Sequence, residues 1–72
     1  MNSEKENITG TYRHFKGKKY KVIGLAKHSE TGEEFVVYQA LYGDREFWIR
    51  PKKMFFESVE KDGKRIPRFK KL

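Results

Sequence analysis

The chain has 72 residues, the size of one small domain, and it contains no cysteine, so neither a disulfide nor a thiolate zinc site can supplement its core. A total of 17 Lys and Arg against 10 Asp and Glu gives a formal charge of +7, which favours an anionic partner, nucleic acid first. No apolar run approaches the roughly 18 residues of a membrane span or the apolar core of a secretion signal, so we expect a cytoplasmic protein.

The first residues are polar and show no apolar periodicity. We therefore expect residues 1–9 to form a flexible N-terminal segment and residues 10–72 to form a single small β-barrel domain. Residues 12–17 alternate aromatic and basic side chains before Gly17. This pattern predicts an extended lead-in segment followed by a turn.

The middle of the chain is rich in β-branched and aromatic residues. In residues 19–26 one face carries Tyr20 and Val22, while the other begins with lysines and ends apolar. This switch predicts a strand that bends at Gly24 and is covered on both sides beyond the bend. Residues 34–41 are apolar on both faces, which predicts a central strand. The Gly43-Asp44 pair then predicts the turn of a central hairpin.

Two prolines punctuate the remainder. Pro51 removes a ladder donor, and its fixed φ suits the first residue of a helical turn over residues 52–56, whose apolar side chains are expected to close one end of the core. Asp62-Gly63 predicts a hairpin, and Pro67 confines the last strand to an edge. The expected strands span residues 19–26, 34–41, 47–50, 58–60 and 65–69. The sequence therefore predicts an all-β fold, a small SH3-like barrel of about five short antiparallel strands with one short helical turn after Pro51.

A family resemblance rests on several spaced motifs. They are Gly10-x-Tyr12-Arg13-His14-Phe15-Lys16-Gly17, Tyr20-x-Val22, Thr31-x-Glu33, Val37-Tyr38-x-x-Leu41-Tyr42, Trp48-x-Arg50-Pro51-x-x-Met54-Phe55, Asp62-Gly63 and Arg68-Phe69. With these motifs, residues 10–69 resemble the DUF1653 domain family of short bacterial proteins. The resemblance implies a stand-alone β domain of bacterial origin, and it implies no catalytic residue, ligand or cofactor.

Catalytic and metal chemistry find little support in the residues. Ser29 follows His28 directly, and neighbours in an extended chain point to opposite sides, which works against a serine nucleophile activated by that histidine. His14 and His28 are too far apart for a metal-binding spacing, and no glycine-rich phosphate loop is present. We therefore expect a non-enzymatic protein with no metal and no cofactor.

Binding of an anionic partner has more support, because basic residues cluster near aromatic ones that offer stacking surfaces for unpaired bases. The candidate binding residues are Tyr12, Arg13, His14, Lys16, Lys19, Tyr42, Trp48 and Arg50. The preferred partner is RNA or single-stranded nucleic acid. The alternative is an extended peptide bound in an aromatic groove formed by Tyr12, Tyr38, Tyr42 and Trp48. A third interpretation remains open, in which Trp48 and Tyr38 are core residues and the lysines form an ordinary solvated face. Pro67 at an edge disfavours open-ended sheet growth, so we expect a monomer or a weak dimer.

Overall fold

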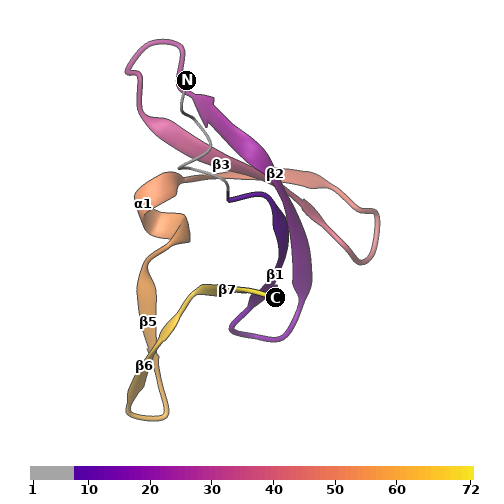
Figure 1. Ribbon diagram of the computed structural model, residues 1–72, viewed down its shortest axis with the longest axis vertical. Helices are drawn as coiled ribbons and strands as arrows, with labels where there is room; N and C mark the ends of the chain where they lie inside the picture. The colour runs from indigo at the N-terminus through magenta and orange to yellow at the C-terminus, as the bar shows by residue number, and fades with distance from the viewer. Residues whose placement is uncertain (1–7) are drawn as a thin grey trace.

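The computed structural model describes residues 8–72, which form seven strands and one short helix (Figure 1). In chain order these are β1 (Gly10–His14), β2 (Lys19–Lys27), β3 (Glu34–Ala40), β4 (Phe47–Pro51), α1 (Lys52–Phe55), β5 (Ser58–Lys61), β6 (Lys64–Pro67) and β7 (Phe69–Lys71). Most of the segment predicted to be flexible, residues 1–9, lies outside the described residues. No helix in the described part of the chain is long and apolar enough to cross a membrane.

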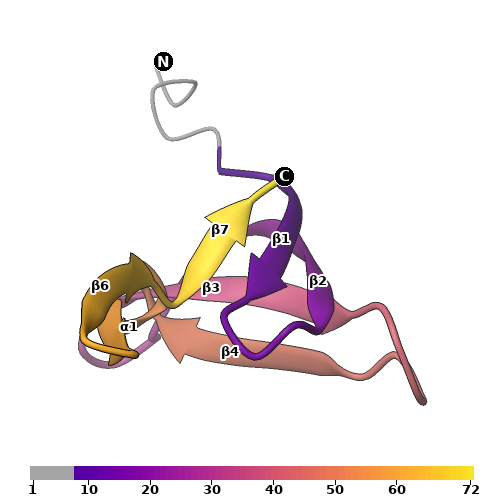
Figure 2. The ribbon, with the colours of Figure 1, turned by 90° about the horizontal axis from the view of Figure 1, so that it is seen from below.

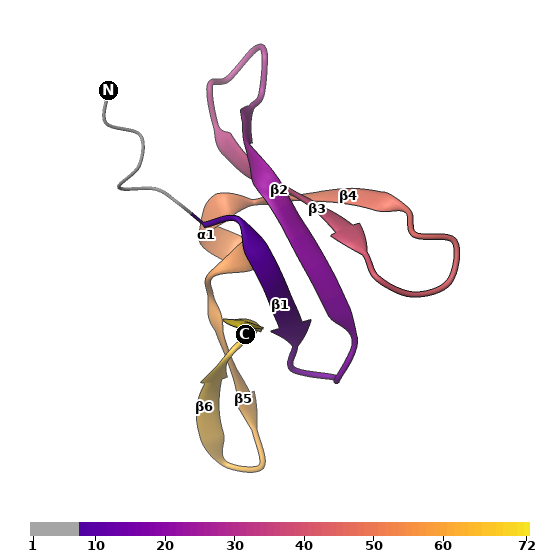
Figure 3. The ribbon, with the colours of Figure 1, turned by 45° about the vertical axis from the view of Figure 1, so that its right-hand side comes forward.

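The strands form two antiparallel sheets, which confirms the all-β prediction. Five strands lie in the order β4-β3-β2-β1-β7, and the β5–β6 hairpin forms a separate two-stranded sheet. Figure 2 shows the larger sheet curling around its concave side, and Figure 3 shows the hairpin projecting from it beside the end of β7. Among the described residues no ladder joins β4 to β7, so the curled sheet is not closed into a barrel.

Two strand predictions need correction at the ends of the chain. The lead-in segment is itself a strand, because β1 pairs with β2 on one side and with β7 on the other. The single strand predicted over residues 65–69 is wrong. The chain leaves the hairpin at Arg68, whose N–H donates to the Glu57 carbonyl at 2.9 Å, and it joins the large sheet from Phe69 onward. Pairing with β1 is a long-range event that local sequence does not specify.

The bend in β2 and the hairpin turn at Asp62-Gly63 follow the sequence more closely. The register of β2 against β3 shifts between Val22 and Gly24, which places a bulge at the predicted bend. Beyond it, however, Ala26 is exposed, so the far half of the strand is not covered on both sides. Asp62 and Gly63 both have positive φ, at 54° and 77°, which is the conformation of a tight two-residue hairpin turn.

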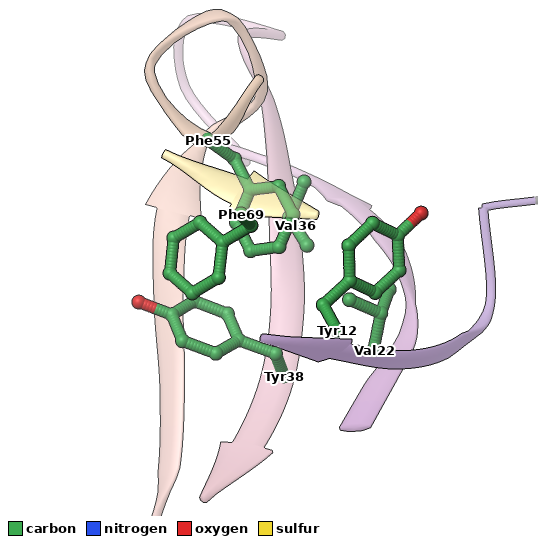
Figure 4. Close-up of a cluster of buried hydrophobic side chains, with 6 residues drawn as sticks. All are labelled: Tyr12, Val22, Val36, Tyr38, Phe55 and Phe69. Carbon is green, nitrogen blue, oxygen red and sulfur yellow. The ribbon is translucent and has the colours of Figure 1, made fainter. Parts of the chain in front are cut away.

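The core lies on the concave side of the sheet and is mainly aromatic (Figure 4). Phe55 from α1 is fully buried and stacks on Phe69 with ring centroids 4.1 Å apart, while Tyr12 and Tyr38 meet Phe55 edge-on at 5.5 and 5.3 Å. The helical turn therefore closes the core through Phe55, as predicted. Pro51 directly precedes the helix rather than beginning it, because its ψ of 136° is extended.

The outer helical side chains contribute less than predicted. Met54 is 42% exposed and Phe56 is 40% exposed. A four-residue helix directs only one side chain fully inward, so the core depends on Phe55 rather than on three neighbouring residues.

Candidate anion-binding surface

Three cationic side chains lie side by side across the convex face of the sheet, the face opposite the core. Tyr12 is buried on the concave side, so its neighbour Arg13 lies on the convex side. Arg13 is directly opposite Lys19 on β2 and directly opposite Lys70 on β7. Directly opposed residues share a face, and neighbouring strands are about 4.8 Å apart, so the row spans roughly 10 Å. We call Lys19, Arg13 and Lys70 the cation row.

Among the described residues, the cation row has no compensating negative charge. All three residues are exposed, and none of them forms an ion pair within residues 8–72. Like charges placed directly opposite each other destabilise a sheet. The described part of the chain thus keeps two pairs of opposed cations, and an anion bound across the row would reduce the repulsion within each pair.

An apolar pocket of about 240 Å³ adjoins the row. Arg13 and Lys70 form its charged margin, and Phe15, Ile66 and Pro67 form its apolar wall. Phe15 is held in the turn after β1 by its backbone N–H, which donates to the Arg68 carbonyl at 2.9 Å. The β5–β6 hairpin supplies the opposite wall, so this pocket exists because the hairpin is inserted between α1 and β7.

The concave face carries a second group of aromatic and basic side chains. The hydroxyls of Tyr20 and Tyr42 are 2.5 Å apart, and burial together with this hydrogen bond raises the pKa of Tyr20 to about 12. The Lys18 ammonium lies 4.7 Å from the centroid of the Tyr42 ring. Arg50 donates from Nε to the Tyr38 hydroxyl at 3.3 Å.

His14 lies on the concave face, beside both the core and this second group of aromatic and basic side chains. Its ring is 4.9 Å from Phe69 and 6.4 Å from Tyr20, centroid to centroid. Burial, followed by the positive charges of Arg50, Lys16 and Arg68, lowers the pKa of His14 below its ordinary value. The neutral ring also accepts the Lys16 backbone N–H at Nδ1, 3.1 Å away. His14 is therefore a neutral acceptor that fixes the β1–β2 turn.

The predicted binding residues do not merge into one patch. Arg13 and Lys19 lie on the convex face, His14, Tyr42 and Arg50 face the concave side, and Lys16 lies in the turn between β1 and β2. Trp48 is 49% exposed on the edge strand β4, where it stands directly opposite Tyr38 and therefore shares the concave face. Tyr12 is only 4% exposed, and its hydroxyl donates to the Ile8 carbonyl at 2.9 Å, so its ring offers no stacking surface.

The candidate binding residues chosen from the sequence did not include Lys70 or the pocket residues Phe15, Ile66 and Pro67. Lys70 follows the buried Phe69, so its parity alone predicts the face opposite the core. Its position beside Arg13 depends on the β1–β7 register, which no local pattern specifies.

Two other surface features, a pocket lined by charged residues and the second histidine, offer no further binding site. A pocket of about 280 Å³ is lined by Glu33, Glu34, Lys52 and Lys53, but Lys52 and Glu34 form an ion pair at 3.4 Å, so its charges largely neutralise each other. The other histidine, His28, uses Nδ1 to accept the Glu30 N–H at 3.1 Å within the β2–β3 loop. No group of three or more metal-ligating side chains occurs in the described part of the chain.

These features define the class of the protein: a small all-β domain with one curled antiparallel sheet, an appended hairpin and an uncompensated basic surface. The chain belongs to the DUF1653 family, described as proteins of unknown function, whose family model matches residues 10–71. A crystal structure of a DUF1653 family protein from Bordetella bronchiseptica superposes with a TM-score of 0.85 at 34% sequence identity, covering 94% of this chain and 90% of that one. No curated protein matches the sequence.

Proposed function

We propose that this protein is a non-enzymatic binding module for RNA or single-stranded DNA. The cation row holds backbone phosphates, and an unpaired base enters the adjoining pocket against Phe15. The observation that carries the proposal is the alignment of Lys19, Arg13 and Lys70 across three strands with no carboxylate opposite them.

The chemistry of the pocket favours a single strand over a duplex. Its wall of Phe15, Ile66 and Pro67 is apolar and offers packing to any base face. Only an unpaired base can leave its stack to enter such a pocket. Because the wall side chains carry no hydrogen-bonding groups, the proposal includes little base preference.

We also infer an SH3-like architecture that is partly open. Four features support it: the strand order β4-β3-β2-β1-β7, the bulge in β2, the helical turn after β4 and the curl around one core. The β5–β6 hairpin is then an insertion before the last strand. Bacterial origin and a cytoplasmic location remain predictions from the sequence.

The alternative, an extended peptide in an aromatic groove, has less support. Tyr12 and Tyr38, two of the four aromatic residues assigned to that groove, are each only 4% exposed. Tyr42 and Trp48 remain accessible, Tyr42 in the β3–β4 loop and Trp48 on the edge strand directly opposite the buried Tyr38.

The proposal is tested by fluorescence anisotropy with a labelled pool of random single-stranded oligonucleotides. Three neutralised phosphates predict a slope of about −2 for log affinity against log salt. Reversing two charges of the row, Lys19→Glu with Lys70→Glu, should weaken binding by about tenfold or more at low salt. Lys61→Glu with Lys64→Glu is the matched control, because it also reverses two lysine charges, those of a directly opposed pair at the tip of the hairpin.

Two results would reject this function. One is a wild-type protein that binds no oligonucleotide at low salt. The other is an equal loss of affinity in the row variant and the hairpin control, because that result assigns binding to net charge rather than to the row.

A further inference from the structure

The edge strand β4 exposes an unusual run of apolar side chains. Phe47 is 63% exposed, Trp48 is 49% exposed and Ile49 is 62% exposed. Within residues 8–72, β4 pairs only with β3, and Figure 2 shows no strand on its other side. Natural proteins protect such edges with charged residues, as the opposite edge does with Lys70 and Lys71 on β7. The middle of β4 has no such protection.

The hydrogen-bond pattern shows which backbone groups are free along this edge. The Ala40 N–H donates to the Glu46 carbonyl at 2.9 Å. Bonded pairs alternate in an antiparallel ladder, so Trp48 and Arg50 also direct their backbone groups toward β3. Phe47 and Ile49 therefore direct their N–H and C=O groups outward, where another strand can pair with them.

The sequence around β4 is complementary to itself when two copies run antiparallel about Trp48. Phe47 of each copy then stands opposite Ile49 of the other, with all four of their outward N–H groups bonded to carbonyls. Glu46 stands opposite Arg50 in a pair of opposite charge. Glu46 has no ion pair among residues 8–72, and Arg50 bonds to Tyr38 through Nε, which leaves its terminal amino groups for a carboxylate.

Neighbouring registers are poorer. Centring the pair on Ile49 places Phe47 opposite Pro51, which has no N–H to donate. Centring it on Phe47 places Ile49 opposite Arg45, which lies outside the strand and has a positive φ of 56°. The register about Trp48 is the one that uses both outward residues and pairs opposite charges.

We propose that β4 pairs with β4 of a second copy of this chain and forms a symmetric dimer centred on Trp48. This surface lies on the edge opposite to β7 and does not depend on the proposed nucleic-acid function. The three exposed side chains present roughly 300 Å² per copy, less than half of the ~800 Å² per partner of a standard interface. The dimer is therefore weak, with a dissociation constant of about 100 µM or more.

Sedimentation equilibrium from about 10 µM to 1 mM tests the dimer, a range chosen to bracket a weak interface. Glu46→Arg and Arg50→Glu should each weaken self-association at least tenfold, because each variant alone places like charges opposite each other. A mixture of the two variants restores both ion pairs in a heterodimer and should recover the association. Arg50→Glu also removes the hydrogen bond to Tyr38, so near-UV circular dichroism is needed to verify that this variant folds. Glu46→Arg breaks no such bond within the described part of the chain and needs no such check.

A control variant distinguishes edge pairing from nonspecific hydrophobic association. Ile49→Lys should abolish the dimer, whereas Ile23→Lys, at a position 44% exposed on β2, should preserve it. A wild-type protein that stays monomeric at about 1 mM, or a dimer that Glu46→Arg leaves intact, overturns the proposal. So does a monomer whose Phe47 and Ile49 amides become protected only when an extended peptide is added, because the edge then serves a foreign strand.

Discussion

Arg13→Glu is expected to stabilise the fold while it weakens the proposed binding of nucleic acid. Arg13 has a cation directly opposite it on each side, Lys19 on β2 and Lys70 on β7. The substitution turns both repulsive neighbours into attractive ones. Cross-strand charge pairs contribute roughly 0.2–1 kcal/mol each, and exposed pairs fall toward the lower end. We therefore expect the free energy of unfolding to rise by about 1 kcal/mol, which raises the Tm of a domain this small by about 4–8 °C.

Thermal and urea denaturation at low salt measure this gain. It should shrink when the salt concentration rises, because salt screens exposed charges. Arg13→Gln is the matched control: it removes the repulsion without adding attraction and should give about half of the gain. A loss of stability in Arg13→Glu at low salt would refute the argument that the row carries unrelieved repulsion. A gain in stability with unchanged oligonucleotide affinity would refute the role of Arg13 in binding.

Three further predictions concern the core and two titrating groups. Phe55→Ala should abolish the cooperative melt, because losing the buried stack on Phe69 costs about 3–5 kcal/mol, which equals the whole free energy of unfolding of a small domain. Phe55→Leu should still melt cooperatively. A cooperative melt of Phe55→Ala would contradict the prediction. Burial and nearby cations lower the pKa of His14 in the folded state. The contribution of His14 to the free energy of unfolding is therefore complete above pH 6.5 and is lost as the pH drops through the folded pKa. His14→Gln should flatten this dependence in acid urea melts, and an unchanged slope would contradict it. The pKa of Tyr20 is raised to about 12 from 10.0, so its contribution to stability is full below pH 10 and falls as the pH rises toward 12. Tyr42→Phe should lower that pKa in a phenolate absorbance titration, and an unchanged titration would contradict the hydrogen bond as a cause.

Local chemistry specified most of the fold. Gly43-Asp44 and Asp62-Gly63 marked turns, and both turns join antiparallel neighbours, β3 with β4 and β5 with β6. Lys19 and Lys21 alternate with the buried Val22, so parity alone assigned their face. These features depend on residues close in sequence, which is why a pattern detects them.

The failures share a different origin. Tyr12-Arg13-His14 alternates in the same way whether the aromatic residues face solvent or a core. Tyr12 is buried by aromatic residues from later in the chain, Phe55 and Phe56, whose rings meet it edge-on. Likewise, the cation row forms when β7 pairs with β1, more than fifty residues later in the sequence. Contacts of this range are set by the packing of the whole domain and not by local periodicity.

The two proposed surfaces predict a coupling that neither predicts alone. The cation row includes the edge strand β7, whereas the self-complementary edge is β4 at the other end of the strand order. A dimer through β4 therefore leaves both cation rows free for one nucleic-acid strand. Two copies held on one oligonucleotide experience an effective concentration near the millimolar range, which is enough to populate even a weak dimer.

Binding to an oligonucleotide of about 40 nucleotides should therefore be cooperative, and binding to one of about 10 nucleotides should not. Ile49→Asn removes an apolar side chain of the edge without changing charge. It should leave the affinity for the short oligonucleotide unchanged and abolish cooperativity on the long one. Anisotropy titrations with both lengths measure this difference. Cooperativity that persists in Ile49→Asn would show that the copies interact on the strand through a surface other than β4.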